Sequence, residues 1–193
     1  GFDVSMVLLD VPDSLVVTDQ STDAVNIRVK GSRAALRSLS VSDIAYVVDL
    51  SGAKAGVTEH EVDAESVKLP RGAEIVSRSP SSIEFAREPR GTKAVKVRAD
   101  LAGEPAPGFV VSAVEVEPLR VRITGARREV LRLSEVVTET IDVAGADESL
   151  EREVRPLLAG PHVRFEEESP IKVRIEVVPL ELKGTEAAEG GTG

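Results

Sequence analysis

The sequence predicts a mainly β protein made of two tandem, small antiparallel β modules, each with about one short helix. Three observations support this fold class. The apolar content is mostly valine, leucine, isoleucine and alanine, while aromatic residues make up 3% of the chain, and β-branched side chains favour strands. Several segments alternate apolar and polar residues with a period of two. The same series of landmarks also occurs twice along the 193 residues, which indicates an internal repeat.

The repeat is visible in the order of its landmarks. Equivalent positions lie 94 residues apart near the start of each copy and 90 residues apart near its end, as short insertions in surface loops produce. The matched pairs are Gly31 with Gly125, Asp49 with Asp142, Gly52 with Gly145, and Pro80 with Pro170. We therefore expect two sister modules, over residues 1–91 and 92–182, followed by a disordered polar tail over 183–193.

In the first module, the alternation in 25–29 predicts a strand with Asn26 and Arg28 facing water. Ser32 then stands as a helix N-cap before alanines and leucines at helical spacing, so a short helix follows the strand. Further strands are predicted over 43–50, over 59–64, and on both sides of Pro80 within 69–87.

The second module begins in the same way. The alternation in 120–123 predicts a strand with Arg120 and Arg122 facing water. Between the modules, the stretch "REPRGTK" (87–93) places a proline and a glycine between two strand patterns. It is therefore predicted to form the inter-module turn.

Composition excludes several functional classes. The formal net charge of −9 argues against nucleic-acid binding, which requires a basic face. The absence of cysteine removes disulfides and thiolate chemistry, and no apolar run approaches the roughly 18 residues of a membrane span. We interpret the chain as a soluble, monomeric fragment, with any membrane anchor lying outside it.

The search for catalytic and metal sites gives none, and no cofactor is expected. His60 and His162 are the two histidines, and without a nucleophile motif they are interpreted as surface or strand-end residues. Glu59, Glu61 and Asp63 share one face of a predicted strand. Their spacing of roughly 6–7 Å is too wide for tight chelation of a cation, so a solvated strand face is the better interpretation.

One basic cluster stands out in this acidic chain. It consists of Arg120, Arg122, Arg127, Arg128 and Arg132. Two interpretations stay open. The arginines could form ion pairs with acidic neighbours such as Glu115, Glu117 and the segment 165–169, or they could bind an acidic partner, a lipid headgroup or a cell-wall polymer at a helix start.

Taken together, the landmarks resemble the YbbR-like repeat family over nearly all of residues 4–180. The most characteristic run is "LAGEPAPGFVVSAVEVEPLRV" (101–121), with its G-x-P-x-x-G-aromatic and Pro-x-x-Val patterns. The other resembling segments are "VNIRVKG" with "LRVRITG", "VVDLSGAKAG" with "TIDVAG", and "VSRSPSSIEF" with "EESPIKVRI". The second copy is shorter between Gly145 and Pro170.

The resemblance implies a β-rich fold related to swapped-hairpin domains such as the C-terminal domain of L25-type ribosomal proteins. It also implies a location on the outer side of a bacterial cytoplasmic membrane and regulation of a membrane-bound diadenylate cyclase, which makes cyclic di-AMP. We therefore expect a non-enzymatic interaction module with that cyclase as its protein partner. The alternative is a structural or ligand-binding module of the cell envelope that docks an acidic polymer or protein through the arginine cluster.

Overall fold

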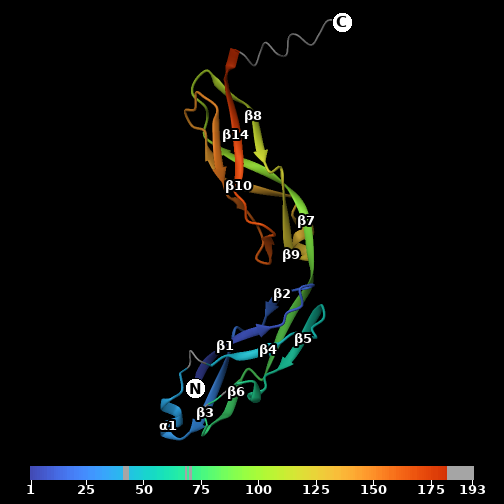
Figure 1. The fold of residues 1–193 in the computed structure, drawn as a ribbon, viewed down its shortest axis with the longest axis vertical. Coiled ribbons are helices and arrows are strands. Elements are labelled where there is room, and N and C mark those ends of the chain that lie inside the picture. The colour runs from blue at the N-terminus through green and yellow to red at the C-terminus, as the bar shows by residue number, and fades with distance from the viewer. Residues whose placement is uncertain (41–43, 68, 70, 182–193) are drawn as a thin grey trace. The chain divides into compact units, whose positions relative to one another are not determined.

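The computed structural model describes residues 1–40, 44–67, 69 and 71–181. Its contacts divide it into two compact units, Gly1–Arg90 and a second unit that begins at Gly91. Both units are mainly β, as predicted (Figure 1). The tail expected over 183–193 lies outside the described residues.

The first unit contains two small sheets. Its elements are β1 (Phe2–Leu9), β2 (Leu15–Gln20), β3 (Ala24–Gly31), α1 (Arg33–Arg37), β4 (Tyr46–Asp49), β5 (Gly56–Glu61), the 3₁₀ turn η2 (Ala64–Ser66), β6 (Ala73–Ser79) and the first half of β7 (Ser82–Ala102). One sheet has the order β4-β1-β3-β6, and in the other β2 and β5 both pair with β7.

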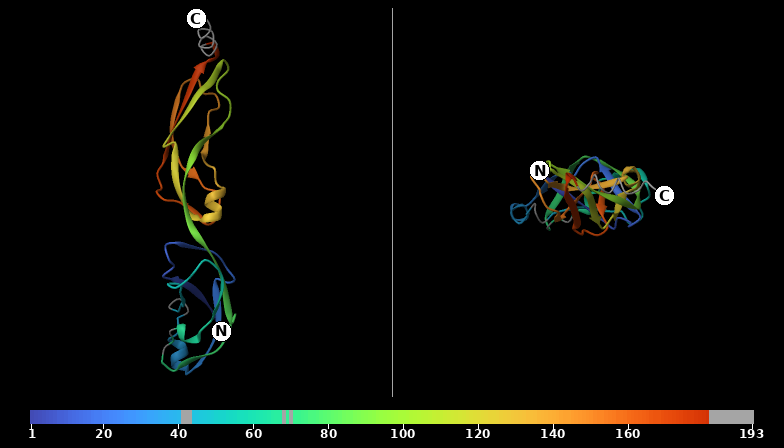
Figure 2. Two further views of the ribbon diagram at one scale, coloured as in Figure 1. Left: turned by 90° about the vertical axis from the view of Figure 1, so that its right-hand side faces the viewer. Right: turned by 90° about the horizontal axis from the view of Figure 1, so that it is seen from above.

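The second unit repeats this plan. Its elements are the second half of β7, β8 (Phe109–Glu117), β9 (Arg120–Ala126), α2 (Arg127–Arg132), β10 (Glu135–Asp142), β11 (Leu150–Val154), β12 (Pro156–Leu157), β13 (Val163–Phe165) and β14 (Ile171–Pro179). The strand order is β12-β10-β7-β9-β13 in one sheet and β11-β14-β8 in the other. Figure 2 shows α1 in blue in the first unit and α2 in yellow-orange in the second.

The internal repeat predicted from sequence is therefore a repeat of topology. The paths β4-β1-β3-β6 and β10-β7-β9-β13 correspond strand for strand, as do β5-β7-β2 and β11-β14-β8. The prediction of antiparallel modules needs one refinement. Each unit contains a parallel pair, β1 with β4 and β7 with β10, because the chain crosses over through intervening strands and a helix before it returns beside its first strand.

The same local bonds confirm the equivalence of the repeats. Asp49 Oδ1 accepts a hydrogen bond from the backbone N–H of Ser51 at 2.8 Å. Asp142 Oδ1 accepts one from Ala144 at the same distance. Each aspartate therefore closes the same turn at the end of its strand, as side chains of this type commonly do.

Alternation along the strands builds the cores. In β14, every second residue from Ile171 to Val177 is buried, and β3 buries Val25 and Ile27 while Asn26 and Arg28 stay exposed, as predicted. The first core surrounds Phe85, which is fully buried. Each such side chain contributes about 1.5–3 kcal/mol through loss of apolar surface from water.

The prediction of a turn over 87–93 is wrong, because these residues belong to β7. Pairing with β2 overrides the local turn signal. Pro89 lies opposite Leu15, and the Arg90 backbone N–H donates to the Ser14 carbonyl at 2.7 Å. The guanidinium of Arg90 also donates to the carbonyls of Asp13 and Leu15. The boundary between the units thus falls inside a strand.

The repeated glycine marks a close approach of two backbones. A Cβ atom at Gly31 would lie 2.5 Å from the carbonyl oxygen of Gly72, and one at Gly125 would collide with the carbonyl oxygen of His162. The next residue in each copy donates its N–H to that same carbonyl, Ser32 at 3.2 Å and Ala126 at 2.9 Å. A glycine at this position lets the helix that follows start against the neighbouring strand.

The predicted helix is confirmed as α1. Ser32 is its N-cap, and the Ser32 hydroxyl accepts a hydrogen bond from the Ala35 N–H at 3.2 Å, which satisfies one of the free donors of a helix start. Across the described part of the chain, no helix combines the length and apolar character that a membrane crossing requires.

We expect Gly31→Ala and Gly125→Ala to destabilise their units by about 1–3 kcal/mol or more, because the added methyl group overlaps backbone atoms that cannot yield cheaply. Urea unfolding of each variant measures the effect. Gly52→Ala is the matched control, because a Cβ atom there meets nothing within 4 Å, and its stability should stay within about 0.5 kcal/mol of the wild type. Equal urea midpoints for all three variants would contradict the close-approach argument.

Candidate functional site

The arginines predicted as a partner-binding cluster lie on β9 and α2. Arg120 and Arg122 are exposed on β9. The alternate residues of the strand face inward, with Val121 half-buried and Ile123 buried. The remaining members of the cluster, all exposed, are Arg127, Arg128 and Arg132 on α2. Sequence alternation thus gave the correct orientation for the two strand arginines.

Acidic side chains partly neutralise the strand arginines. Arg122 Nε lies 2.5 Å from Glu166 Oε2, with the two side chains 65% and 40% exposed. Arg120 and Glu167 line, with this pair, a shallow hollow of about 230 Å³. The predicted ion pairing with the segment 165–169 is therefore confirmed for Arg122, and this part of the cluster is a surface of mixed charge. Ion pairs as exposed as this one contribute about 0–1 kcal/mol.

The sequence places two arginines at the start of α2, where backbone N–H groups can bind an anion. Its N-cap, Ala126, has no side-chain cap and is buried, and its N–H already donates to the carbonyl of His162. Arg127 lies close against β7, where a Cβ atom on Gly91 would come within 3.1 Å of the Arg127 Cα. The helix is six residues long, too short to supply an N-terminal site by itself.

Glu129 on α2 binds His162 in the loop that leads into β13. Glu129 Oε1 lies 2.7 Å from His162 Nδ1, and Glu129 Oε2 accepts a hydrogen bond from the His162 backbone N–H at 3.2 Å. Both side chains are about three-quarters buried. Because the carboxylate contacts both the ring and the backbone of His162, it fixes this loop onto the helix.

This contact changes the acidity of the carboxyl group. The hydrogen bond from the His162 side chain is the largest cause that lowers the pKa of Glu129 below its ordinary 4.5, and the charge of Arg132 adds to it. Burial acts in the opposite direction. His162 is therefore more than a strand-end residue, since it is one half of an ion pair whenever its ring is protonated.

The acidic row predicted on one strand face is confirmed for Glu59 and Glu61 only, because β5 ends at Glu61 and Asp63 lies beyond it. Glu59 and Glu61 are exposed on this strand, and Glu59 Oε1 accepts a hydrogen bond from the hydroxyl of Ser82 at 2.5 Å. His60, on the opposite face, meets the edge of Phe85 with ring centroids 6.4 Å apart. Among the residues described by the structure, no group of three histidine or acidic side chains is placed to hold a metal ion.

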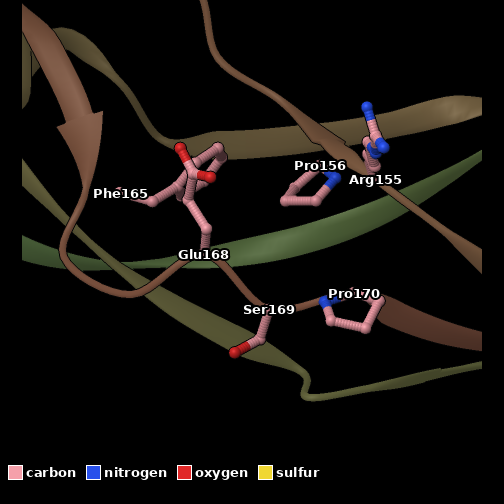
Figure 3. A pocket seen from close by; sticks show the side chains of 6 residues that line it. All are labelled: Arg155, Pro156, Phe165, Glu168, Ser169 and Pro170. Carbon is pink, nitrogen blue, oxygen red and sulfur yellow. The ribbon is translucent and has the colours of Figure 1, made fainter.

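A hollow of about 480 Å³ lies between the end of β13 and the start of β14. Its walls are Arg155, Pro156, Phe165, Glu168, Ser169 and Pro170. Figure 3 shows the side chains of Arg155, Glu168 and Ser169 pointing in different directions from this hollow. Small-molecule sites need polar groups that converge on the ligand. The hollow therefore offers an apolar surface of one ring and two prolines, with charges at its rim.

One buried arginine, in β7, was not predicted by any sequence pattern. Arg87 is 5% exposed, and its guanidinium donates to the hydroxyl of Thr58 while its Nε has no hydrogen-bond partner among the described residues. An unmatched polar group of this kind is costly. The prediction of a turn over 87–93 implied an exposed Arg87, because turn residues usually lie at the surface.

Comparisons with known proteins match both repeats. A family model described as YbbR-like protein matches residues 6–85 and 95–177. The crystal structure of a YbbR-like protein from Streptococcus pneumoniae is similar in fold, with a TM-score of 0.53, 16% identity, and 92% of this chain and 93% of that chain covered. A solution structure of SuR18C from Streptococcus thermophilus covers 47% of this chain and 86% of its own, with 21% identity and a TM-score of 0.37. Among curated proteins, none matches.

We expect Glu129→Gln to destabilise the second unit at neutral pH and to have less effect in acid. The folded-state pKa of Glu129 is lowered, so its contacts stabilise the fold above about pH 4.5 and lose that contribution as the pH falls through the folded-state pKa. Unfolding curves across this pH range measure the difference from the wild type. Glu153→Gln, at an exposed position on β11, controls for the loss of one charge. A Glu129→Gln difference that stays constant from neutral to acidic pH would contradict the assignment.

Proposed function

The chain belongs to the YbbR-like protein family, and from this premise we propose that it is a non-enzymatic regulatory module that acts by binding another protein. The observation that carries the proposal is the repetition of one small β fold, matched twice by the same family model. Each unit fills its own interior with apolar side chains, and the hollows considered above are open at the surface. A partner would therefore bind the exposed side chains on the outer faces of the strands.

We further propose that this partner is a membrane-bound diadenylate cyclase and that the module lies on the outer side of a bacterial cytoplasmic membrane. The resemblance of the landmarks to the YbbR-like repeats supports this choice of partner. The absence of cysteine from the chain is compatible with an oxidising compartment. In this proposal an anchor outside the present chain holds the module near the cyclase, and binding changes the rate at which cyclic di-AMP is made.

A second candidate function is docking of an acidic cell-envelope polymer or protein through the arginine cluster. The exposure of Arg127 and Arg132 on one short helix favours it. The pairing of Arg122 with Glu166 weighs against it, because that pair removes net positive charge from the same surface.

The cyclase proposal predicts that the full-length parent protein co-purifies with the cyclase and that its deletion changes the cellular level of cyclic di-AMP. Affinity purification followed by nucleotide quantification tests both. Deletion of an unrelated envelope protein is the control for general effects on the membrane. The regulatory proposal fails if the two proteins do not bind and the nucleotide level is unchanged.

The two candidate functions differ in the effect of charge reversal on α2. If the arginine cluster were the docking surface, Arg127→Glu with Arg132→Glu would weaken binding to a cell-wall fraction by about tenfold or more, because long-range attraction would become repulsion. We expect no such loss. A sedimentation assay with cell-wall material measures it, and Arg152→Glu with Arg155→Glu, at two exposed positions on and just after β11, is a control of equal charge change. A selective loss in the α2 variant would favour polymer docking.

A further inference from the structure

The two repeats present different chemistry on the same outer face. In the first unit, Val7 of β1 lies directly opposite Val47 of β4. Leu9 follows two residues later on the same face of β1, because side chains alternate along a strand. Val7, Leu9 and Val47 are 42%, 45% and 36% exposed. We call these three residues the apolar face.

The second unit has polar or small residues at the equivalent positions. The Leu50 N–H donates to the Leu9 carbonyl at 2.9 Å, and the Val143 N–H donates to the Ala102 carbonyl at 2.8 Å. This shared bond, with the matching turns at Asp49 and Asp142, makes Leu9 equivalent to Ala102. The same register then makes the pair Val7 and Val47 equivalent to the pair Asp100 and Thr140.

The pair in the second unit is joined by a polar contact. The Thr140 hydroxyl donates to Asp100 Oδ2 at 2.6 Å. The same strand topology therefore folds with an acid and a hydroxyl at these positions. The fold does not require apolar residues there, so the apolar face calls for another explanation. Neighbouring exposed apolar side chains that form a contiguous patch commonly mark a protein interaction site.

Negative charge borders the apolar face. Asp49 lies opposite Leu9 on β4, and Asp3 lies on the same outer face of β1. Hydrogen bonds from Ser51 lower the pKa of Asp49, so its carboxylate stays charged at neutral pH. At the positions equivalent to Asp3 and Ser5, the second unit has Lys96 and Arg98, and Arg98 pairs with Glu135 at 2.9 Å.

We propose that the apolar face is the surface through which this chain binds its protein partner, and that the partner presents an apolar side chain flanked by lysine or arginine. The proposal rests on the proposed function, because it names the surface used for that binding. The apolar centre supplies the surface buried on association, and the acidic border selects a basic rim on the partner. The second repeat, polar at the same place, does not take part in this contact.

Charge favours a basic protein surface over two other possible occupants, an anionic lipid surface and a second copy of the chain. An anionic lipid surface attracts basic residues, whereas Asp3 and Asp49 beside the apolar face would be repelled by it. A second copy of the chain would bring the same carboxylates to the contact, where like charges oppose association. A basic protein surface is the occupant that satisfies both the apolar centre and its border.

The test replaces the apolar face by the residues of the sister repeat. Val7→Asp with Val47→Thr copies the pair Asp100 and Thr140, and Leu9→Ala copies Ala102. The diadenylate cyclase, purified in detergent, is the probe, and its affinity for the chain is measured by surface plasmon resonance. We expect each variant to weaken binding by about tenfold or more, as loss of a central interface contact does. Val57→Thr, at a 69% exposed position on β5, is the control and should bind like the wild type.

The outcomes separate the two levels of the proposal. If the wild type does not bind the cyclase, the proposed function fails and this inference fails with it. If the wild type binds and both variants bind equally well, only the assignment of the apolar face is overturned. Circular dichroism and thermal unfolding check that the variants fold, and Leu9→Ala keeps the test decisive if the double variant does not.

Two further measurements address the border and the alternative occupants. Wild-type binding should weaken as salt increases, and Asp49→Asn should reduce that dependence, because screening acts only on charges. An unchanged salt dependence would overturn the basic-rim assignment. A dimer in sedimentation analysis that the double variant abolishes would assign the face to a second copy. Binding to anionic phosphatidylserine vesicles that the double variant loses would assign it to lipid, and either result would overturn the proposal.

Discussion

Two backbone segments in each unit approach so closely that no side chain fits between them, and the local architecture depends on this constraint. Gly31 lies against the carbonyl of Gly72, and Gly125 against the carbonyl of His162. Because each carbonyl also accepts the N–H of the next residue, the chain leaves β3 or β9 in a defined direction and enters a short helix. The helix then leads the chain back to the strand that pairs in parallel with the first strand of the unit.

Local sequence patterns predicted much of the fold because strands such as β3 and β14 bury one face and expose the other. The alternation in 25–29 and 120–123 gave the correct orientation of the arginines at 28, 120 and 122, and the Ser32 cap gave the start of α1. The parallel pairs could not be predicted in this way, because pairing between strands distant in sequence leaves no periodic signal. The turn assigned to 87–93 failed for a related reason. The bonds of Arg90 to residues 13–15 come from another part of the chain and outweigh the turn preference of Pro89 and Gly91.

The candidate surfaces were predictable to different degrees. Clustered arginines are visible in a sequence, and so is the acidic segment that supplies Glu166. The apolar face was not visible, because Val4 to Leu9 includes apolar residues on both faces of β1 and a near-continuous apolar run does not tell which side is exposed. The comparison of the two repeats identifies it, because the second repeat has Asp100 at the position of Val7 and still adopts the same fold. An apolar residue at this position is therefore not needed for folding. Features that both repeats share, such as the close-approach glycines, serve the fold. Features present in one repeat, such as the apolar face, are candidates for function.

The continuity of β7 has a consequence for how the chain tolerates changes in length. The buried residues on both sides of the unit boundary, Phe85 and Arg87 before it and Val95 and Val97 after it, all have odd numbers. The alternation is interrupted between these two pairs, where Pro89 is exposed and Arg90 and Gly91 are both half-buried. Each half of β7 pairs within its own unit, so an insertion of one or two residues near Gly91 leaves the register of both halves unchanged. Such insertions lengthen the strand that joins the two units before they change what either core buries.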